Sequence, residues 1–161
     1  KRVIMAWSDE NTSGIENLRR ATQALRVEFI EQRIADATAT KAFYASFPYK
    51  NGDAIFRASD AASGTIVKDL IAISLEEKIP LSGTNMVDVE SGAIMSYGAN
   101  YEKIGEQSAR LMDAILRGTK PSDIPIELPE TVELVINIKT ATAFGLTIPD
   151  AVLLQANRII Q

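Results

Sequence analysis

The sequence predicts an α/β fold, with an open, mostly parallel, doubly wound sheet and helices on both of its faces. Short apolar runs alternate five times with stripes of apolar residues at helical spacing. Turn-forming residues follow the runs, and no internal repeat or low-complexity segment breaks the alternation. Strands and helices that alternate in this way join by right-handed crossovers, so we expect the loops after the strands to share one edge of the sheet.

The first predicted elements are a buried strand, a helix, a more polar strand and a second helix. Residues 3–7 are apolar without interruption and lead into turn formers, as in a strand buried on both faces. The helix after them has an apolar stripe made up of Ile15, Leu18, Thr22 and Leu25. Charges alternate with apolar residues at 27–33, which predicts a strand nearer the edge of the sheet. Pro48 ends the helix predicted at 38–47.

Three more strands follow in the same rhythm. Short strands are predicted at 54–56 and 79–83. The helix between them has an inward-facing stripe made up of Val67, Leu70, Ile71, Ser74 and Leu75. A fifth strand at 93–96 leads into a long helix that Gly118 ends. That helix is expected to bury Ile104, Ser108, Leu111 and Ile115.

The tail of the chain follows a different pattern. Its extended connector is marked by Pro121, Pro125 and Pro129. Residues 132–136 form another apolar run, and a final amphipathic helix is predicted over residues 149–160, with an apolar face that needs a partner surface. The connector is therefore the candidate boundary between a compact body at residues 1–118 and an appendage at residues 119–161.

The composition excludes several classes of function. The 161 residues contain no cysteine and no histidine, so thiolate and imidazole metal ligands, Ser-His pairs and Cys nucleophiles are ruled out. We expect no metal, no other cofactor and no enzymatic reaction. A net charge of -4 gives no electrostatic reason to gather around phosphates, so nucleic acid is not an expected partner. Because the chain has neither a start methionine nor a signal-peptide core, we expect a processed product or a piece of a longer protein.

The most informative segment is residues 91–98, which predicts a strand and a sharp turn before the long helix opens at residues 100–105. In a parallel α/β sheet this junction lies at the carboxyl end of a strand, where small ligands bind. We therefore expect a site at this edge, formed together with the loops at 7–11, 57–60 and 82–85.

The side chains of these loops suit an amino acid or another small zwitterion. Asp60 or Asp9 is a candidate partner for an ammonium group, and Arg57 for a carboxylate. Hydroxyl groups and helix-start amides are further candidates for the carboxylate. Trp7 and Tyr97 can pack on an apolar or aromatic group. The predicted ligand-binding residues are Trp7, Ser8, Asn11, Ser59, Asp60, Thr84 and Tyr97.

Each candidate also has a structural interpretation. The two aromatic residues are suited to the core, and the polar residues of the first loop are suited to a turn. Asp60 is suited to the amino-terminal cap of a helix. Asp88 and Glu90 are two residues apart, and we interpret them as solvated loop carboxylates rather than as a catalytic pair.

The order of the elements resembles that of a known protein family. The resemblance is carried by residues 1–4, 18–25, 89–105, 115–121 and 133–149, and the last of these segments is its most specific part. On these segments the chain is similar to the carboxyl-terminal part of ABC-transporter substrate-binding proteins, in the tryptophan/tyrosine-type family with the type I periplasmic-binding fold. The likeness covers nearly the whole chain.

The resemblance implies a protein of two similar lobes joined by a hinge. The missing amino-terminal lobe would precede Lys1. Residues 1–118 would be an α/β ligand-binding lobe, and residues 119–161 would be a connector, an extra strand and terminal helices that complete the lobe or the hinge. A homodimer of the fragment is a further possibility for its assembly.

The resemblance also implies a place and a partner. The location would be periplasmic or otherwise extracytoplasmic, the parent would carry a signal peptide, with or without a lipid anchor, and the ligand would pass to the membrane permease of an ABC transporter. Ser59 and Asp60 keep the pair of a hydroxyl residue and an aspartate that is usual in the family. The chain departs from the family in a shorter first loop and in Ala61 and Ala62, where relatives often have polar residues.

Two other functions remain as alternatives, a ligand-sensing effector lobe of a transcription regulator and a flavodoxin-like enzyme domain. A regulator would need a DNA-binding module elsewhere. The fifth strand ends without the lysine of a phosphoacceptor receiver, and neither a GxGxxG nor a GxxxxGK[ST] loop is present. We therefore expect a solute-binding lobe that acts by closure around a small ligand.

Overall fold

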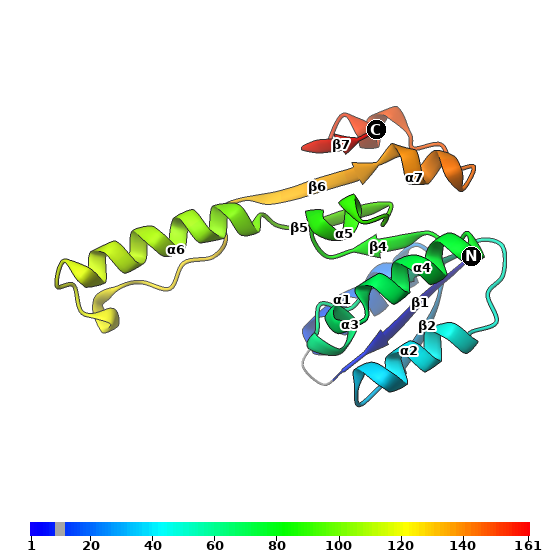
Figure 1. The fold of residues 1–161 in the computed structure, drawn as a ribbon, viewed down its shortest axis with the longest axis horizontal. Helices are drawn as coiled ribbons and strands as arrows, with labels where there is room; N and C mark the ends of the chain where they lie inside the picture. Colours follow the sequence, from blue (N-terminus) through cyan, green and yellow to red (C-terminus); the bar gives the residue numbers. More distant parts are fainter. Residues whose placement is uncertain (9–11) are drawn as a thin grey trace.

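Within residues 1–8 and 12–161, which the structure describes, a computed structural model shows seven strands in one sheet, in the order β2-β1-β3-β4-β5-β6-β7 (Figure 1). The strands are β1 (Arg2–Trp7), β2 (Glu28–Arg33), β3 (Asp53–Phe56), β4 (Leu81–Gly83), β5 (Met95–Ala99), β6 (Val132–Asn137) and β7 (Arg158–Ile160). Neighbouring strands are parallel except for the antiparallel pair β5 and β6. The predicted α/β fold with a mostly parallel sheet is confirmed.

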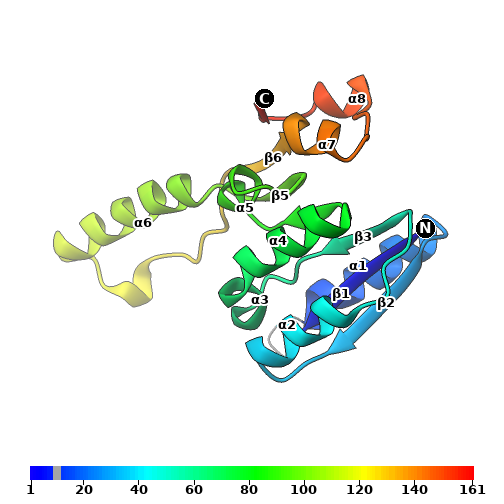
Figure 2. The same cartoon turned by 45° about the vertical axis from the view of Figure 1, so that its right-hand side comes forward.

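Helices lie on both faces of this sheet (Figure 2). They are α1 (Thr12–Ala24), α2 (Ala37–Ser46), α3 (Ala61–Thr65), α4 (Val67–Glu77), α5 (Met86–Glu90), α6 (Tyr101–Leu116), α7 (Ile138–Ala143) and α8 (Asp150–Leu153), with a 3-10 turn at Pro121–Asp123. Side-chain oxygens cap the amino termini of α2, α5, α6 and α7, at Asp36, Asn85, Asn100 and Asn137. No helix in the described ranges is long and apolar enough to cross a bilayer.

The core lies on both sides of β1, as its uninterrupted apolar run predicts. Ile4 and Ala6 face a cluster that includes Tyr44 and residues of α4, whereas Met5 faces Ile15 of α1. Tyr44 is fully buried, and its hydroxyl accepts a hydrogen bond from the Ala6 backbone N–H at 2.8 Å. Burial raises the pKa of this hydroxyl above its usual range, so Tyr44 stays a neutral member of the core.

The more polar second strand lies at the edge of the sheet, as its alternating charges predict. β2 pairs only with β1 among the described strands. Its Glu31 accepts a hydrogen bond from Arg19 of α1 at 2.8 Å, in a solvent-exposed ion pair. The edge position therefore follows from charges that a central strand would have to bury.

The prediction of a final helix over residues 149–160 is wrong. Helix α8 covers only Asp150–Leu153, and Arg158–Ile160 form β7, which runs parallel to β6. The Asn157 side-chain oxygen accepts a hydrogen bond from Leu134 N at 2.8 Å, so the chain is held against β6 before β7 begins. Pairing with an open strand edge satisfies backbone groups that the end of a helix would leave unpaired.

The long helix forms as predicted but does not pack on the sheet. Helix α6 and the connector after it project from the body as an arm, defined here as residues 100–131 (Figures 1 and 2). Contrary to expectation, the four residues of this helix that were expected to be buried are not buried, and one of them, Ser108, is exposed. The four are Ile104, Ser108, Leu111 and Ile115. The helical spacing correctly identified the helix, but the surface against which it packs is not supplied by the sheet.

A partly buried ion pair at the amino ends of the strands makes part of the stability depend on pH. Asp53 Oδ1 accepts a hydrogen bond from Arg2 Nε at 2.7 Å, and Oδ2 accepts one from Lys50 N at 2.8 Å. The hydrogen bond from Arg2 lowers the pKa of the Asp53 carboxyl. A carboxyl with a lowered pKa stabilises the fold above its ordinary pKa of about 3.9, and this contribution is lost as the pH falls further.

We expect Asp53→Asn to flatten the acid limb of the stability profile. The wild type should lose stability more steeply than the variant between about pH 5 and pH 3, because only the wild type takes up a proton at residue 53 when it unfolds. Thermal unfolding across this range measures the slopes. Asp113→Asn, at an exposed carboxylate of α6, should leave the slope unchanged. Equal slopes for Asp53→Asn and the wild type would contradict the assignment.

Candidate functional site

The carboxyl ends of four parallel strands meet at one edge of the sheet. β1, β3, β4 and β5 run parallel in register, so the loops after them emerge side by side. We call this edge the rim and define it by residues 7–8, 57–60, 84–85 and 97–100. The predicted convergence of these loops is present. The candidates Asn11 and Asp9 lie outside the described residues.

A cavity of about 540 Å³ opens at the rim between α1 and the strand ends. Three of the predicted residues line it together, namely Ser59, Thr84 and Tyr97. The Tyr97 side chain is 70% exposed, so it is available to a ligand rather than packed in the core. The cavity thus combines two hydroxyl side chains and an aromatic ring, which is a mixture that suits a small organic molecule.

Asp60 ties two loops of the rim together. Its Oδ1 accepts a hydrogen bond from Ser63 N at 2.8 Å, which caps helix α3, and its Oδ2 accepts one from Ser8 N at 2.9 Å. The structural interpretation of Asp60 as a cap is therefore realised. Each carboxylate oxygen can accept more than one hydrogen bond, so the cap leaves acceptor capacity for a ligand ammonium.

Trp7 and Ser8 carry polar atoms without partners. Trp7 is half-buried against the cluster of Met5, Ile15 and Ala58. Among the side chains that the structure describes, at residues 1–8 and 14–161, the buried polar atoms without a hydrogen bond are Trp7 Nε1, Ser8 Oγ and Ser63 Oγ. Buried polar atoms that lack partners cost free energy, and here they lie near the place where Asp60 joins the loop after β1 to the start of α3. They are candidate hydrogen-bonding groups for a ligand.

Arg57 and Asp88 form a buried pair, which corrects the interpretation of both residues. Their side chains are each 6% exposed, and Arg57 Nη2 lies 2.7 Å from Asp88 Oδ2. Asp88 is therefore not a solvated loop carboxylate. Arg57, held by Asp88 and also bonded to the Thr84 hydroxyl, is not a free group for a ligand carboxylate. Sequence spacing does not reveal the pair, because burial of the two charges depends on tertiary packing.

The same pair fixes the position of Thr84 in the rim. Asp88 Oδ2 accepts a hydrogen bond from Thr84 N at 2.7 Å, so one carboxylate holds both the arginine and the loop. On the other side of this loop, a Cβ added to Gly98 would lie 2.5 Å from the Thr84 carbonyl oxygen. Only glycine allows β5 to approach so closely. Thr84 is therefore positioned from both sides.

Sequence reasoning missed several residues that line the cavity. Asn17 and Leu18 reach it from α1, and Tyr101 reaches it from the first turn of α6. Leu18 belongs to the helical stripe and was assigned to packing alone. Tyr101 directly follows the cap residue Asn100, and this position beside the rim is the one signal that could have identified it.

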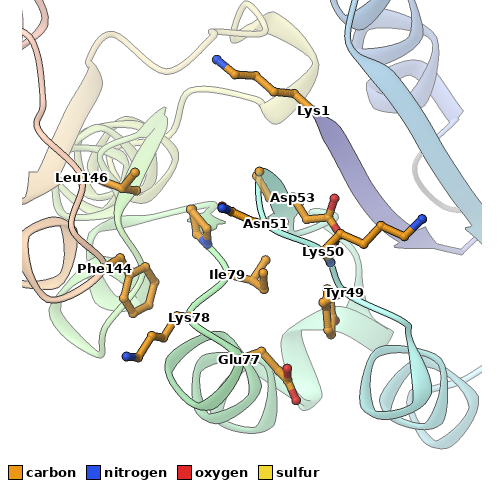
Figure 3. A pocket seen from close by; sticks show the side chains of 13 residues that line it. Lys1, Tyr49, Lys50, Asn51, Asp53, Glu77, Lys78, Ile79, Phe144 and Leu146 are labelled. Atoms are coloured by element: carbon orange, nitrogen blue, oxygen red, sulfur yellow. Dashed lines mark hydrogen bonds between the residues drawn. The ribbon is translucent and has the colours of Figure 1, made fainter.

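A second cavity, of about 560 Å³, lies at the opposite edge of the sheet (Figure 3). Lys1, Lys50 and Lys78 line it, together with Phe144 and Leu146 from the chain after α7. Asp53, which also lines it, is already committed to Arg2. In the described part of the chain no three acidic side chains converge so as to hold a metal ion. Ligands of open α/β sheets bind at the carboxyl ends of the strands, so we take the rim cavity as the candidate site.

Comparisons with known sequences agree with this architecture. The family model described as "ABC transporter substrate binding protein" matches residues 1–160. A curated relative from Clostridioides difficile (strain R20291), named "Tyrosine-binding protein", is 25% identical over 145 residues, which cover 89% of this chain and 42% of the relative.

Two solved structures have the same fold over nearly the whole chain. A conserved domain protein from Vibrio cholerae is 27% identical with a TM-score of 0.82, over 99% of this chain and 54% of that chain. An ABC domain from Streptococcus pneumonia, solved in complex with L-Trp, is 21% identical with a TM-score of 0.83, over 99% of this chain and 55% of that chain. The chain thus spans about half the length of the relatives that it matches.

Proposed function

The chain belongs to the ABC transporter substrate-binding protein family, and from this premise we propose that it forms one wall of the solute site of an ABC importer. The observation that carries the proposal is the rim cavity, where Ser59, Thr84 and Tyr97 face the same space. The side chains that line this cavity are suited to binding a small ligand by shape, hydrogen bonds and stacking. The protein would act by closing around a ligand rather than by chemistry.

We propose an amino-acid-like ligand with an apolar or aromatic side chain. Tyr97 and the partly exposed Phe56 offer ring surfaces inside the cavity. Asp60 would accept from the ligand ammonium, and the unpartnered groups of Trp7 and Ser8 would donate to its carboxylate. One relative is named as tyrosine-binding, and another was solved with L-Trp, which favours this ligand class.

The other wall of the site would come from a second lobe. Because the chain spans about half the length of its relatives, we propose that the full protein carries an amino-terminal lobe before Lys1. Residues 1–118 would be the ligand-binding lobe, and residues 119–161 would complete the lobe or the hinge. The full protein would be extracytoplasmic and would deliver its ligand to a membrane permease.

We expect Tyr97→Ala to weaken ligand binding by the full-length protein by about tenfold or more, because a buried aromatic contact is worth roughly 1.5–3 kcal/mol. Isothermal calorimetry with L-tyrosine, L-tryptophan and aliphatic amino acids measures the affinity. Leu25→Ala removes another exposed apolar side chain, distant in sequence from the rim, and should leave the affinity unchanged.

Unchanged affinity in Tyr97→Ala would remove this residue from the site. The proposed function itself would fail if no amino acid bound the full-length protein at millimolar concentration. Turnover of a bound compound would favour an enzyme, and specific binding to an operator DNA would favour a regulator.

A further inference from the structure

The hydroxyl group of Thr84, in the lining of the rim cavity, already accepts two hydrogen bonds from the protein. Its Oγ1 accepts one from Arg57 Nη2 and a longer one from Asn85 Nδ2 at 3.5 Å. A hydroxyl oxygen has two lone pairs and one hydrogen, so a hydroxyl that accepts twice can only donate to a further partner. A ligand group that hydrogen-bonds to Thr84 must therefore be an acceptor.

Among the described residues, the hydrogen of this hydroxyl has only a poor acceptor. Thr84 Oγ1 lies 3.3 Å from Asp88 Oδ2, which is longer than the roughly 2.5–3.0 Å usual for a hydrogen bond between oxygens. The same Oδ2 atom also accepts from Arg57 Nε at 3.1 Å, from Arg57 Nη2 at 2.7 Å and from Thr84 N at 2.7 Å. This oxygen is therefore crowded, and a ligand acceptor in the cavity would compete well for the Thr84 hydrogen.

The groups around Thr84 cannot exchange their roles as donors and acceptors. An arginine side chain has donors and no acceptor, and Arg57 is held in place by Asp88, with both side chains 6% exposed. The Asn85 Oδ1 atom accepts from Asp88 N at 3.1 Å and so caps α5, which leaves the Asn85 amide nitrogen to face Thr84. The protein itself thus makes the Thr84 hydroxyl a donor, before any ligand binds.

Close packing keeps the loop of Thr84 at this place. A Cβ added to Gly83 would lie 2.5 Å from Asp88 Cβ, so a larger residue before Thr84 would displace the carboxylate. On the other side, β5 already approaches the Thr84 carbonyl oxygen as closely as a glycine allows. The hydroxyl therefore faces the rim cavity from a fixed position.

The neighbours of Thr84 in the cavity are aromatic. Phe56 lies on β3 and Tyr97 on β5, the two strands beside β4, and their side chains are 39% and 70% exposed. The candidate groups for the ammonium and the carboxylate belong to the loops after β1 and β3, whereas Thr84 follows β4. An amino acid that uses the first two loops for its main-chain groups would direct its side chain toward β4 and β5. Thr84 would then meet the side chain of the ligand.

We propose that Thr84 is a specificity-determining residue that donates a hydrogen bond to an oxygen on the side chain of the ligand, and that Arg57 is the positioning residue that makes it a donor. The oxygen-bearing group that fits beside Phe56 and Tyr97 is a phenol, so the preferred ligand is tyrosine. An indole N–H is a donor only, so tryptophan gains no hydrogen bond from Thr84, and phenylalanine has no polar side-chain atom. The inference rests on the proposed function for the presence of an amino acid in the cavity.

Calorimetry on the full-length protein tests the proposal with L-tyrosine, L-phenylalanine and para-methyl-L-phenylalanine, which is close to tyrosine in shape. The wild type should bind L-tyrosine about tenfold or more tightly than either analogue, because a site that hydrogen-bonds a ligand hydroxyl discriminates against ligands that lack it. Thr84→Val keeps the shape of the side chain and removes its hydroxyl, so it should bring the three affinities together without weakening the binding of L-phenylalanine. Thr84→Ser keeps the hydroxyl and should keep the preference.

The double variant Arg57→Met with Asp88→Leu tests the positioning role. It keeps the Thr84 hydroxyl but removes the arginine that occupies one of its lone pairs, so the hydroxyl is no longer held as a donor. The preference for L-tyrosine over L-phenylalanine should therefore fall to about threefold or less. Thermal unfolding shows whether the variant is folded, and the ratio of the two affinities is a quantity that a merely structural role of the pair would not change.

Equal affinity of the wild type for L-tyrosine and L-phenylalanine would overturn the proposal, while the proposed function would stand because amino acids bind. A preference that survives in Thr84→Val would also overturn it, because another residue would then contact the phenol. A preference that is lost in Thr84→Val but kept in the double variant would overturn the role of Arg57. If no amino acid binds, the proposed function and this inference fail together.

Discussion

Replacing Asp88 by alanine should destabilise the protein by about 3–5 kcal/mol, because the variant leaves a buried guanidinium without its counter-ion. The Arg57 side chain is 6% exposed, so water cannot solvate the charge in the folded state. The Thr84 N–H would lose its acceptor as well. Domains of this kind are stable by only about 5–15 kcal/mol, so the loss would be a large fraction of the total. Urea unfolding at neutral pH measures it.

Two further variants distinguish the buried charge from a simple loss of contacts. Glu90→Ala, two residues away, removes a partly exposed partner of Arg158 and should cost less than about 1 kcal/mol. The double variant Arg57→Met with Asp88→Leu should recover most of the stability, because it replaces both charges by apolar groups. If Asp88→Ala were as stable as Glu90→Ala, the pair would contribute little and Thr84 would not depend on it.

Asp60→Ala should cost about 2–3 kcal/mol and weaken ligand binding by about tenfold or more. The loss of stability combines a helix cap, typically about 1 kcal/mol, with a charge-assisted hydrogen bond of about 1.5–3 kcal/mol, which are not fully additive. The loss of affinity follows because Ser8 and helix α3 would no longer be held in one arrangement. Thermal unfolding and calorimetry on the full-length protein measure the two effects separately.

Asp60→Asn shows whether this residue also contacts the ligand. Asparagine caps helices as well as aspartate does, so the variant should keep helix α3 capped, but its amide nitrogen cannot accept the hydrogen bond from Ser8 N. Binding that is weakened for ligands with an ammonium group, but not for analogues that lack this group, would indicate an ionic contact with the ligand ammonium. Unchanged binding would leave Asp60 as a cap alone. Asp36→Ala, which removes the cap of α2, should lower stability without affecting affinity.

The sequence predicts the sheet well because its signals are local. The apolar run at residues 3–7, the polar edge strand at 27–33 and the helix end at Pro48 each depend on neighbours in the chain, and the structure has strands and a helix end at these places. The rim follows from the same information, since parallel strands place their following loops at one edge. Ser59, Thr84 and Tyr97, which line the rim cavity, are predicted from this information.

The misses share a different cause, because each depends on a contact between distant segments. Residues 158–160 form a strand because β6 offers an open edge there, whereas their spacing from Val152 and Leu153 equally suits a helix. The Arg57–Asp88 pair joins two loops whose burial is set by the whole fold. The helix of the arm was recognised from its stripe, but the stripe carries no information about what would cover it.

The paired base of the arm has a mechanical consequence. The chain leaves and returns as two adjacent strands that are hydrogen-bonded up to Ala99 and Val132. A two-stranded ribbon resists being stretched or sheared, but it twists easily, since twist is the natural deformation of β-structure. In the two-lobed protein that we propose, opening and closing would therefore be torsion about the long axis of this ribbon, with a restoring torque, rather than the free rotation that a single flexible linker would permit.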